Sequence, residues 1–335
     1  MVQRDFELLG AAVGDAAFVR AHTAERAAKA GDLLDSLGEL EDPQVALRLL
    51  RACAGFARML HSMRCNPVTA QTMALDMFDG MLRRSFGDFT GLHLTAAQWQ
   101  QASLGLAHGG LGLRSTSQHA AAAFLASWAS TLTSAAELDA TFSLDEAKAC
   151  PDVLAALAAF NAQLPASQAI SLDTALGHKQ KALSQMIDLA AWETQLAHST
   201  ITGRATLLSE ASVGGRAFLN AVPSGRTQME PAAFLSELRV RLQVPDAASD
   251  TWCPLCDAVL DHNSHHAGMC VAGGERTQRH HAVRDLVHTW CQRAGLRPER
   301  EKLGLLLPTS PEDMNNSQAR RPADEIGRAS CRERV

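Results

Sequence analysis

The strongest constraint on this chain is a run of cysteines and histidines within eighteen residues: Cys253-Pro-Leu-Cys256 followed by His262, His265, His266 and Cys270. A C-x2-C pair on a tight turn supplies two thiolates to one ion, and a later His and Cys complete the tetrahedron that Zn²⁺ prefers. The segment is otherwise polar, so a metal ion would supply folding energy that its few apolar side chains cannot. We expect a structural zinc site rather than a catalytic one, because four protein ligands leave no position for water.

His266 is the preferred histidine ligand, which gives the pattern C-x2-C-x9-H-x3-C. His265 is the alternative, with C-x2-C-x8-H-x4-C, and His262 is a poorer third candidate. The competing interpretation is a metal-free loop of ordinary thiols, since free Cys is commonly a small buried hydrophobic residue. The expected metal ligands are Cys253, Cys256, His266 and Cys270.

The composition favours helices. Ala and Leu dominate the 335 residues, aromatic residues make up 5% and Tyr is absent, which suits long helices better than a sheet-rich sandwich. No apolar run approaches the ~20 residues that cross a bilayer, and charges stand where a signal peptide would be apolar. We expect a mainly α, intracellular protein that has no membrane contact and is not secreted.

Apolar periodicity places several helices. A helix from about Val68 to Phe86 is expected to turn Met73, Met77, Phe78, Met81 and Leu82 inward. The cluster Gly109-Gly-Leu-Gly-Leu113 is expected to form a tight turn, not a phosphate loop, ahead of a nearly all-apolar helix, 117–134, in the middle of the bundle. A last helix, about 276–294, places Val283, Leu286, Val287 and Trp290 on one face.

Charge limits the partners that the chain can bind. A net charge of −5 argues against a free-standing, charge-driven nucleic-acid binder, so any such binding must be local or must depend on a larger protein. Arginines on either side of the Cys/His segment can form a basic rim that contacts RNA or DNA, or they can be solvated helix faces, and the spacing favours neither. The candidate nucleic-acid contacts are Arg239, Arg241, Arg276, Arg279 and Arg284, with Arg226 as a neighbour of the first two.

The sequence gives little support to an enzyme. It holds no Asp-Asp pair, no G-x-S-x-G and no H-E-x-x-H, so neither a polymerase palm nor a conventional hydrolase is expected, and no small-molecule substrate is evident. A metal-dependent enzyme with an open site would use His262, His265 and either His280 or His281. It is disfavoured because no general base is evident nearby.

Several sequence islands, read in order, resemble the carboxyl-terminal portion of reverse-transcriptase-like proteins of non-long-terminal-repeat retrotransposons with a restriction-like endonuclease. The islands are Asp42–Arg51, Gly109–Ser115 with His119–Trp128, Ala217–Pro223, Pro231–Phe234 with Leu238–Leu242, the Cys/His motif, Arg279–Asp285 and Arg320–Asp324. The family's motif has Ala directly after its histidine, as in His266-Ala-Gly-Met-Cys270, which supports His266 over His265.

The resemblance implies a domain order. A helical thumb-like region would span 1–150, a helical linker region 151–245, a CCHC zinc module 246–275, and the amino-terminal part of a restriction-like endonuclease domain 276–324. The fold would then be a helical bundle followed by a small zinc module and the beginning of an α/β nuclease-like domain. The partners would be RNA or DNA and the location nuclear. A helical scaffold or protein-interaction module with a structural zinc knuckle is the alternative, and the mildly acidic charge favours it.

The resemblance also bears on catalysis. Arg321-Pro-Ala-Asp324 resembles the element that carries the first carboxylate of a PD-(D/E)xK nuclease, which needs a second acid and a Lys to use Mg²⁺. The last eleven residues, 325–335, resemble a translated sequencing-adapter peptide, so the natural sequence is expected to stop near Asp324. Asp324 alone cannot organise a metal ion. We therefore expect Mg²⁺ only in the intact parent nuclease and no DNA cleavage by this chain.

Overall fold

The computed structural model describes residues 5–263 and 265–300. They form two compact units, with the division between Val244 and Pro245. The helices of the first unit are α1 (Ala16–Gly38), α2 (Pro43–Leu49), α3 (Leu60–Cys65), α4 (Val68–Thr90), α5 (Ala96–Ser103), α6 (Thr116–Leu138), α7 (Leu144–Lys148), α8 (Pro151–Asn161), α9 (Leu172–Leu176), α10 (Gln180–His198), α11 (Ile201–Ala211), α12 (Ala217–Asn220) and α13 (Pro231–Leu242).

Shorter elements join these helices. The strands β1 (Phe6–Leu8) and β2 (Ala11–Val13) form an antiparallel hairpin in the first unit. A π-helical turn, Leu50–Ala54, continues α2. Short 3-10 turns lie at Phe56–Arg58, Leu106–His108, Ala166–Gln168 and Gly225–Thr227 in the first unit and at Ala272–Gly274 in the second.

The second unit is small. Its described elements are β3 (Thr251–Trp252), β4 (Val259–Leu260), α14 (His265–Met269) and α15 (Glu275–Arg293). In the parts of the chain that the structure covers, the fold is mainly α, and no α/β nuclease-like domain is present among them. Asp324 lies outside the described residues. None of the described helices is long and apolar enough to cross a membrane.

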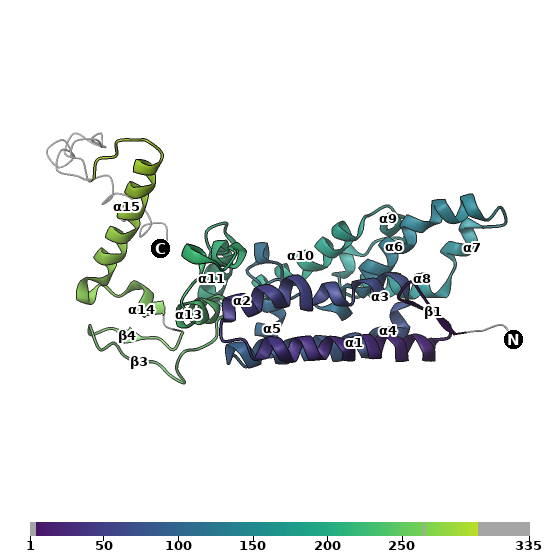
Figure 1. Ribbon diagram of the computed structural model, residues 1–335, viewed down its shortest axis with the longest axis horizontal. Coiled ribbons are helices and arrows are strands. Elements are labelled where there is room, and N and C mark those ends of the chain that lie inside the picture. Colours follow the sequence, from purple (N-terminus) through teal and green to yellow (C-terminus); the bar gives the residue numbers. More distant parts are fainter. Residues whose placement is uncertain (1–4, 264, 301–335) are drawn as a thin grey trace. The chain divides into compact units, whose positions relative to one another are not determined.

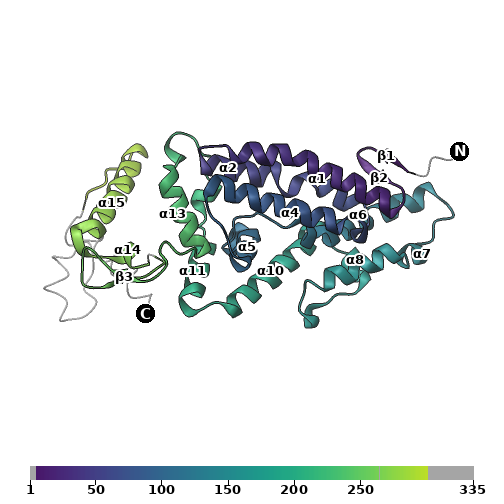
Figure 2. The same cartoon turned by 90° about the horizontal axis from the view of Figure 1, so that it is seen from below.

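Two large apolar cores, and a small cluster of Ala12, Val19 and Ala70, hold the first unit together. In the larger core α1 lies along α4, as Figures 1 and 2 show, and α2, α5 and α13 pack against the same cluster. The two long helices approach closely at Gly31, where a Cβ atom would lie 2.8 Å from Met81 Cε. The second core joins α6 to α8 and α10 through residues such as Leu125, Phe160 and Ile187. The division expected at residue 150 remains a prediction.

Two expectations about buried helix faces are wrong. Met73 and Met77 are 79% and 45% exposed, whereas the buried face of α4 runs through Leu75, Phe78 and Leu82. Because successive helical residues are about 100° apart, Met77 lies well off the face that Phe78 occupies. In α6 only the first half is buried in the bundle, and Leu138 near its end is 88% exposed.

The glycine cluster forms the tight turn expected from the sequence. Gly109 and Gly112 adopt φ angles of +71° and +75°, which suit glycine, and α6 begins at Thr116. A Cβ atom on Gly110 would lie 2.1 Å from the backbone oxygen of Leu104. The backbone oxygens of Leu106 and Gly110 in this turn accept hydrogen bonds from Arg241 of α13.

Candidate metal centre

The first two expected ligands lie on the turn of the β3–β4 hairpin. Thr251 pairs with Leu260 and Trp252 with Val259, and the backbone N–H of Cys253 donates to the Ala258 oxygen at 3.0 Å. The hairpin closes around Pro254 and Leu255, so both thiols of the C-x2-C pair lie at its tip. The backbone N–H of Leu255 also donates to Cys253 Sγ at 3.5 Å.

The other two ligands come from α14. His266 lies in its first turn, and the backbone N–H of Cys270, just past its end, donates to the His266 oxygen at 2.7 Å. The Asp261 carboxylate accepts from the backbone N–H groups of His265 at 3.1 Å and His266 at 2.7 Å. Those donors have no partner within the first turn of a helix. Asp261 therefore fixes the start of α14 and with it the position of His266.

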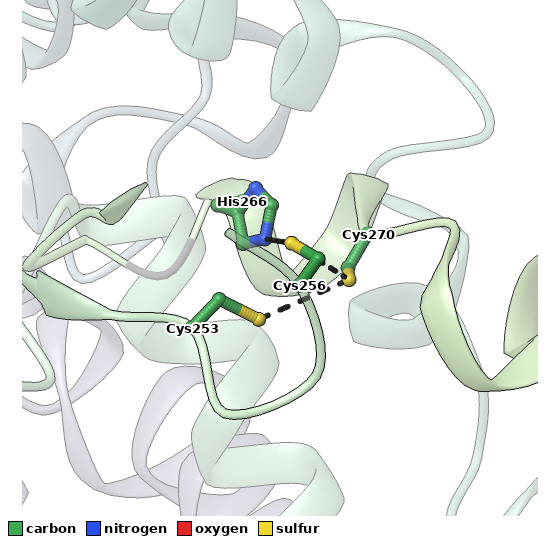
Figure 3. A group of neighbouring side chains, drawn as sticks. All are labelled: Cys253, Cys256, His266 and Cys270. Carbon is green, nitrogen blue, oxygen red and sulfur yellow. Dashed lines mark hydrogen bonds between the residues drawn. The ribbon is translucent and has the colours of Figure 1, made fainter. Parts of the chain in front are cut away.

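The four side chains converge on one point, as Figure 3 shows. Their ligand atoms all lie within 4.8 Å of one another. The Sγ atom of Cys270 lies 3.9 Å from that of Cys253 and 3.8 Å from that of Cys256, and Cys256 Sγ lies 3.2 Å from His266 Nε2. Metal–sulfur bonds of about 2.3 Å place the sulfurs of a tetrahedral site about 3.8 Å apart. This Cys3His cluster can therefore hold a metal ion such as zinc.

The electrostatics of the hairpin tip favour a thiolate. The hydrogen bond from the backbone N–H of Leu255 lowers the pKa of the Cys253 thiol to about 6. Burial opposes this effect, and a hydrogen bond with His266 adds to it. The pKa of the Cys256 thiol is raised: the N–H of Ala258 favours the thiolate, but burial and the neighbouring thiols of Cys253 and Cys270 outweigh it. A cation at the centre of the cluster would relieve the repulsion between neighbouring thiolates.

The described residues of the second unit, 245–263 and 265–300, form almost no apolar core. Cys270, at 5% exposed, is the unit's single buried residue between Pro245 and Arg300, apart from the undescribed position 264 and the side chain of Glu275. Trp252, Leu255 and Met269 around the cluster are all more than half exposed. Since a small unit with few buried apolar groups needs another source of stability, metal binding would contribute directly to its folding.

The remaining histidines lie outside the cluster. The alternative ligand, His265, is not in the group, although its backbone N–H shares the Asp261 carboxylate. His262 Nδ1 lies 2.8 Å from Asp250 Oδ1. His280 and His281 have ring centroids 5.8 Å apart on α15. Within residues 5–263 and 265–300, no other group of three His, Cys, Asp or Glu side chains is placed to hold an ion.

Asp261 is a residue whose role the sequence did not reveal. It carries no ligand atom, but it holds the backbone of the segment that does. Asp261 lies four residues before His265 and five before His266, which is farther than the two or three residues that a helix-capping side chain usually spans, so the sequence carries no clear signal for this role. Backbone hydrogen bonds from both histidines lower the pKa of the Asp261 carboxyl despite the opposing effect of burial.

Arg241 does not belong to a nucleic-acid surface, and its expected role there is wrong. It is fully buried at the end of α13, and its guanidinium donates to the backbone oxygens of Gly110, Leu106, Glu210 and Gly215 at 2.9–3.1 Å. It also forms an ion pair of 2.9 Å with the Glu210 carboxylate. Because every donor of the guanidinium faces the protein interior, none is available to a phosphate.

The other candidate arginines have different settings. Arg276 and Arg279 are exposed on α15, and Arg239 is half-buried on α13. Arg284 is also half-buried and its Nε donates to Asp285 Oδ1 at 2.9 Å. Contact between these residues and nucleic acid stays a prediction.

The first unit contains a further buried polar group. Asp188 on α10 forms an ion pair with Arg114 and lies 3.3 Å from His119 Nε2 on α6. Burial lowers the pKa of His119, against the effect of Asp188, and the hydrogen bonds from His119 and Arg114 lower the pKa of Asp188 although burial opposes them. The group ties the start of α6 to α10.

Comparison with known proteins gives no relative: no protein-family model, no curated protein and no solved structure matches this chain.

Proposed function

We propose that the Cys3His cluster binds one Zn²⁺ ion and that the ion is structural. Three cysteines and one histidine are ligands that zinc prefers over harder cations such as Mg²⁺ and Ca²⁺. All four positions of a tetrahedron would be filled by the protein, so none remains for a reacting water molecule. Because the described residues of the second unit bury almost no apolar side chains, the ion would contribute to the stability of this part of the chain.

We propose further that the chain is a fragment of a retroelement reverse transcriptase and endonuclease protein, and that it contacts RNA or DNA without a complete catalytic site. One observation carries this proposal: the closed Cys3His cluster is followed directly by α15, on which Arg276 and Arg279 are exposed. A metal-stabilised unit that presents arginines is suited to phosphate contacts. The order of the sequence islands supplies the family. Asp324 and Mg²⁺ would matter only in the intact parent nuclease.

A helical scaffold with the same zinc knuckle is the second candidate. The net charge of −5 favours it. The burial of Arg241 in an ion pair with Glu210 also favours it, because that arginine cannot contact a nucleic acid. On this alternative the arginines of α15 are solvated, and the chain binds a protein rather than a nucleic acid.

Metal analysis of the purified full chain tests the site. We expect one zinc per chain, and we expect it to be lost in Cys256→Ser, because three ligands hold the ion much more weakly than four. The matched control is Cys53→Ser, which removes an exposed free thiol of the first unit and should leave the metal content unchanged. An unchanged zinc content in Cys256→Ser would refute the assignment.

Nucleic-acid binding separates the two functions. Fluorescence anisotropy with labelled RNA and DNA at ~0.1 M salt should show binding that weakens steeply as salt is raised. No binding of either polymer to the zinc-loaded chain at this salt concentration would contradict the retroelement proposal and favour the scaffold.

A further inference from the structure

One face of α15 carries an apolar stripe that no other described element of the second unit covers. Val283 is 63% exposed, Leu286 and Val287 are each 49% exposed, and Trp290 is 58% exposed. Their separations of three, one and three residues place all four on one side of a helix. Figure 1 shows α15 as one continuous helix. An exposed aromatic side chain within such a stripe is typical of a binding surface.

The same face is basic in its first turns. Arg276, Arg279 and His280 precede Val283 by seven, four and three residues, so the helical repeat brings them to the side of the apolar stripe. Arg276 and Arg279 are exposed. Residues 275–300 hold six arginines and three acidic residues, whereas the whole chain is acidic. This stretch therefore carries a net positive charge, although the chain as a whole is negatively charged.

The combination defines the chemistry of a partner. The arginines favour an anionic partner. The flat indole of Trp290 and the aliphatic side chains beside it favour an apolar, planar one. Single-stranded nucleic acid presents both, since its phosphates are regularly spaced and its bases are free to stack on an aromatic ring. A duplex offers the phosphates but keeps the faces of its bases stacked inside the helix. From Arg279 to Trp290 the helix extends over roughly 16 Å.

We propose that this face of α15 binds single-stranded RNA or DNA, with Trp290 stacking on an unpaired base and with Arg276 and Arg279, in the first turns of the helix, contacting phosphates of the same strand. The inference rests on the proposed function, which states only that the chain contacts nucleic acid, and it names the form of the polymer and the residues that recognise it. Trp290 supplies the preference for a single strand, and the arginines supply affinity that depends on salt.

The test compares one sequence in two forms, a labelled single strand of ~12 nucleotides and the same strand annealed to its complement, a length within the range of known single-strand sites. Binding to the zinc-loaded full chain is measured at low salt. We expect the single strand to bind more tightly and Trp290→Ala to weaken that binding by roughly tenfold, while duplex binding changes little. Trp290→Phe keeps a stacking ring and should recover part of the affinity.

Trp252→Ala is the matched control, since Trp252 is 75% exposed in the same unit but lies on β3. It should leave single-strand affinity unchanged, with zinc content verified for each variant. Quenching of tryptophan fluorescence by the single strand should disappear in Trp290→Ala and persist in Trp252→Ala. Arg279→Gln should weaken both forms and lower the slope of log affinity against log salt by about 1.

The outcomes separate this inference from the proposed function. Equal binding of single strand and duplex, or full single-strand affinity in Trp290→Ala, overturns the inference and leaves nucleic-acid contact standing. Binding to vesicles of anionic phospholipid that depends on Trp290, without binding to the single strand, overturns it in favour of a membrane surface. No binding of either nucleic-acid form overturns both the inference and the retroelement proposal.

Discussion

Replacing Arg241 by Met should cost the first unit a large part of its stability. The substitution keeps a long, unbranched side chain but removes the positive charge and every donor. It leaves the Glu210 carboxylate, whose side chain is 15% exposed, without its ion-pair partner. It also leaves the carbonyl oxygens of Leu106, Gly110 and Gly215 without the donor they now have.

The magnitude follows from removing one partner of a buried ion pair, which costs about 3–5 kcal/mol. Burial already raises the pKa of Glu210, against the effect of Arg241, so the carboxyl is expected to take up a proton in the variant and offset part of the loss. Set against a typical unfolding free energy of about 5–15 kcal/mol, the variant should be marginal. Arg241→Lys keeps the charge but lacks the planar fork, and an intermediate loss is expected.

Urea unfolding followed by far-ultraviolet circular dichroism measures the effect. The unfolding transition that does not change when zinc is removed is assigned to the first unit. Arg20→Met is the control, because Arg20 is exposed on α1, and its unfolding free energy should change by no more than about 0.5 kcal/mol. A loss below about 1 kcal/mol in Arg241→Met, with an unchanged m value, would show that this side chain does not hold the helices together as reasoned.

Four further outcomes are expected. Asp261→Ala should weaken zinc binding by roughly 10–100-fold in competition with a chromophoric chelator, whereas Asp261→Asn, which keeps an accepting oxygen, should lose less. The first unit should lose stability as pH falls, because the pKa of His119 is lower in the folded state than in the unfolded chain. The stabilisation that comes from keeping this ring neutral is complete above the unfolded pKa of about 6.5 and is lost as pH drops below that value. His119→Gln should flatten this part of a plot of Tm against pH. The pKa of Asp188 is lowered as well, so a second loss is expected below about pH 4, and it should be absent in Asp188→Asn. Gly110→Ala should destabilise the first unit by at least about 1–3 kcal/mol in urea unfolding, because its Cβ would meet backbone oxygens at 2.1 Å and 2.5 Å; an unchanged midpoint would contradict the close approach.

The Cys/His cluster could be predicted because its information is local. Four ligands within eighteen residues leave few ways for the chain to fold around them, and the structure brings together Cys253, Cys256, His266 and Cys270 as expected. The tight glycine turn and the mainly α fold were also confirmed, since each follows from nearby residues. The family, the partners and the nuclear location stay predictions.

The missed features are those that depend on distant segments. Arg241 has the same local sequence signal whether it is solvated or buried, and its partner Glu210 lies 31 residues away. The partners Asp188 and His119 lie on different helices, and their contact has no signature in the sequence of either one. Periodicity identified α4 as amphipathic but assigned Met73 to the wrong side, because flexible Met suits a core and a surface equally well.

The side chain at the end of α13 also bears on how the protein is made. Helices α1 to α5 leave the ribosome long before Arg241 does, yet that guanidinium bonds both to the turn at Gly110 and to Glu210 at the end of α11. Phe234, Leu238 and Leu242 complete the larger core from the same late segment. During synthesis the larger core therefore stays incomplete, with apolar surface of the early helices exposed, until nearly all of the first 244 residues have emerged. A nascent chain stalled before α13 should be a preferred substrate for chaperones and proteases.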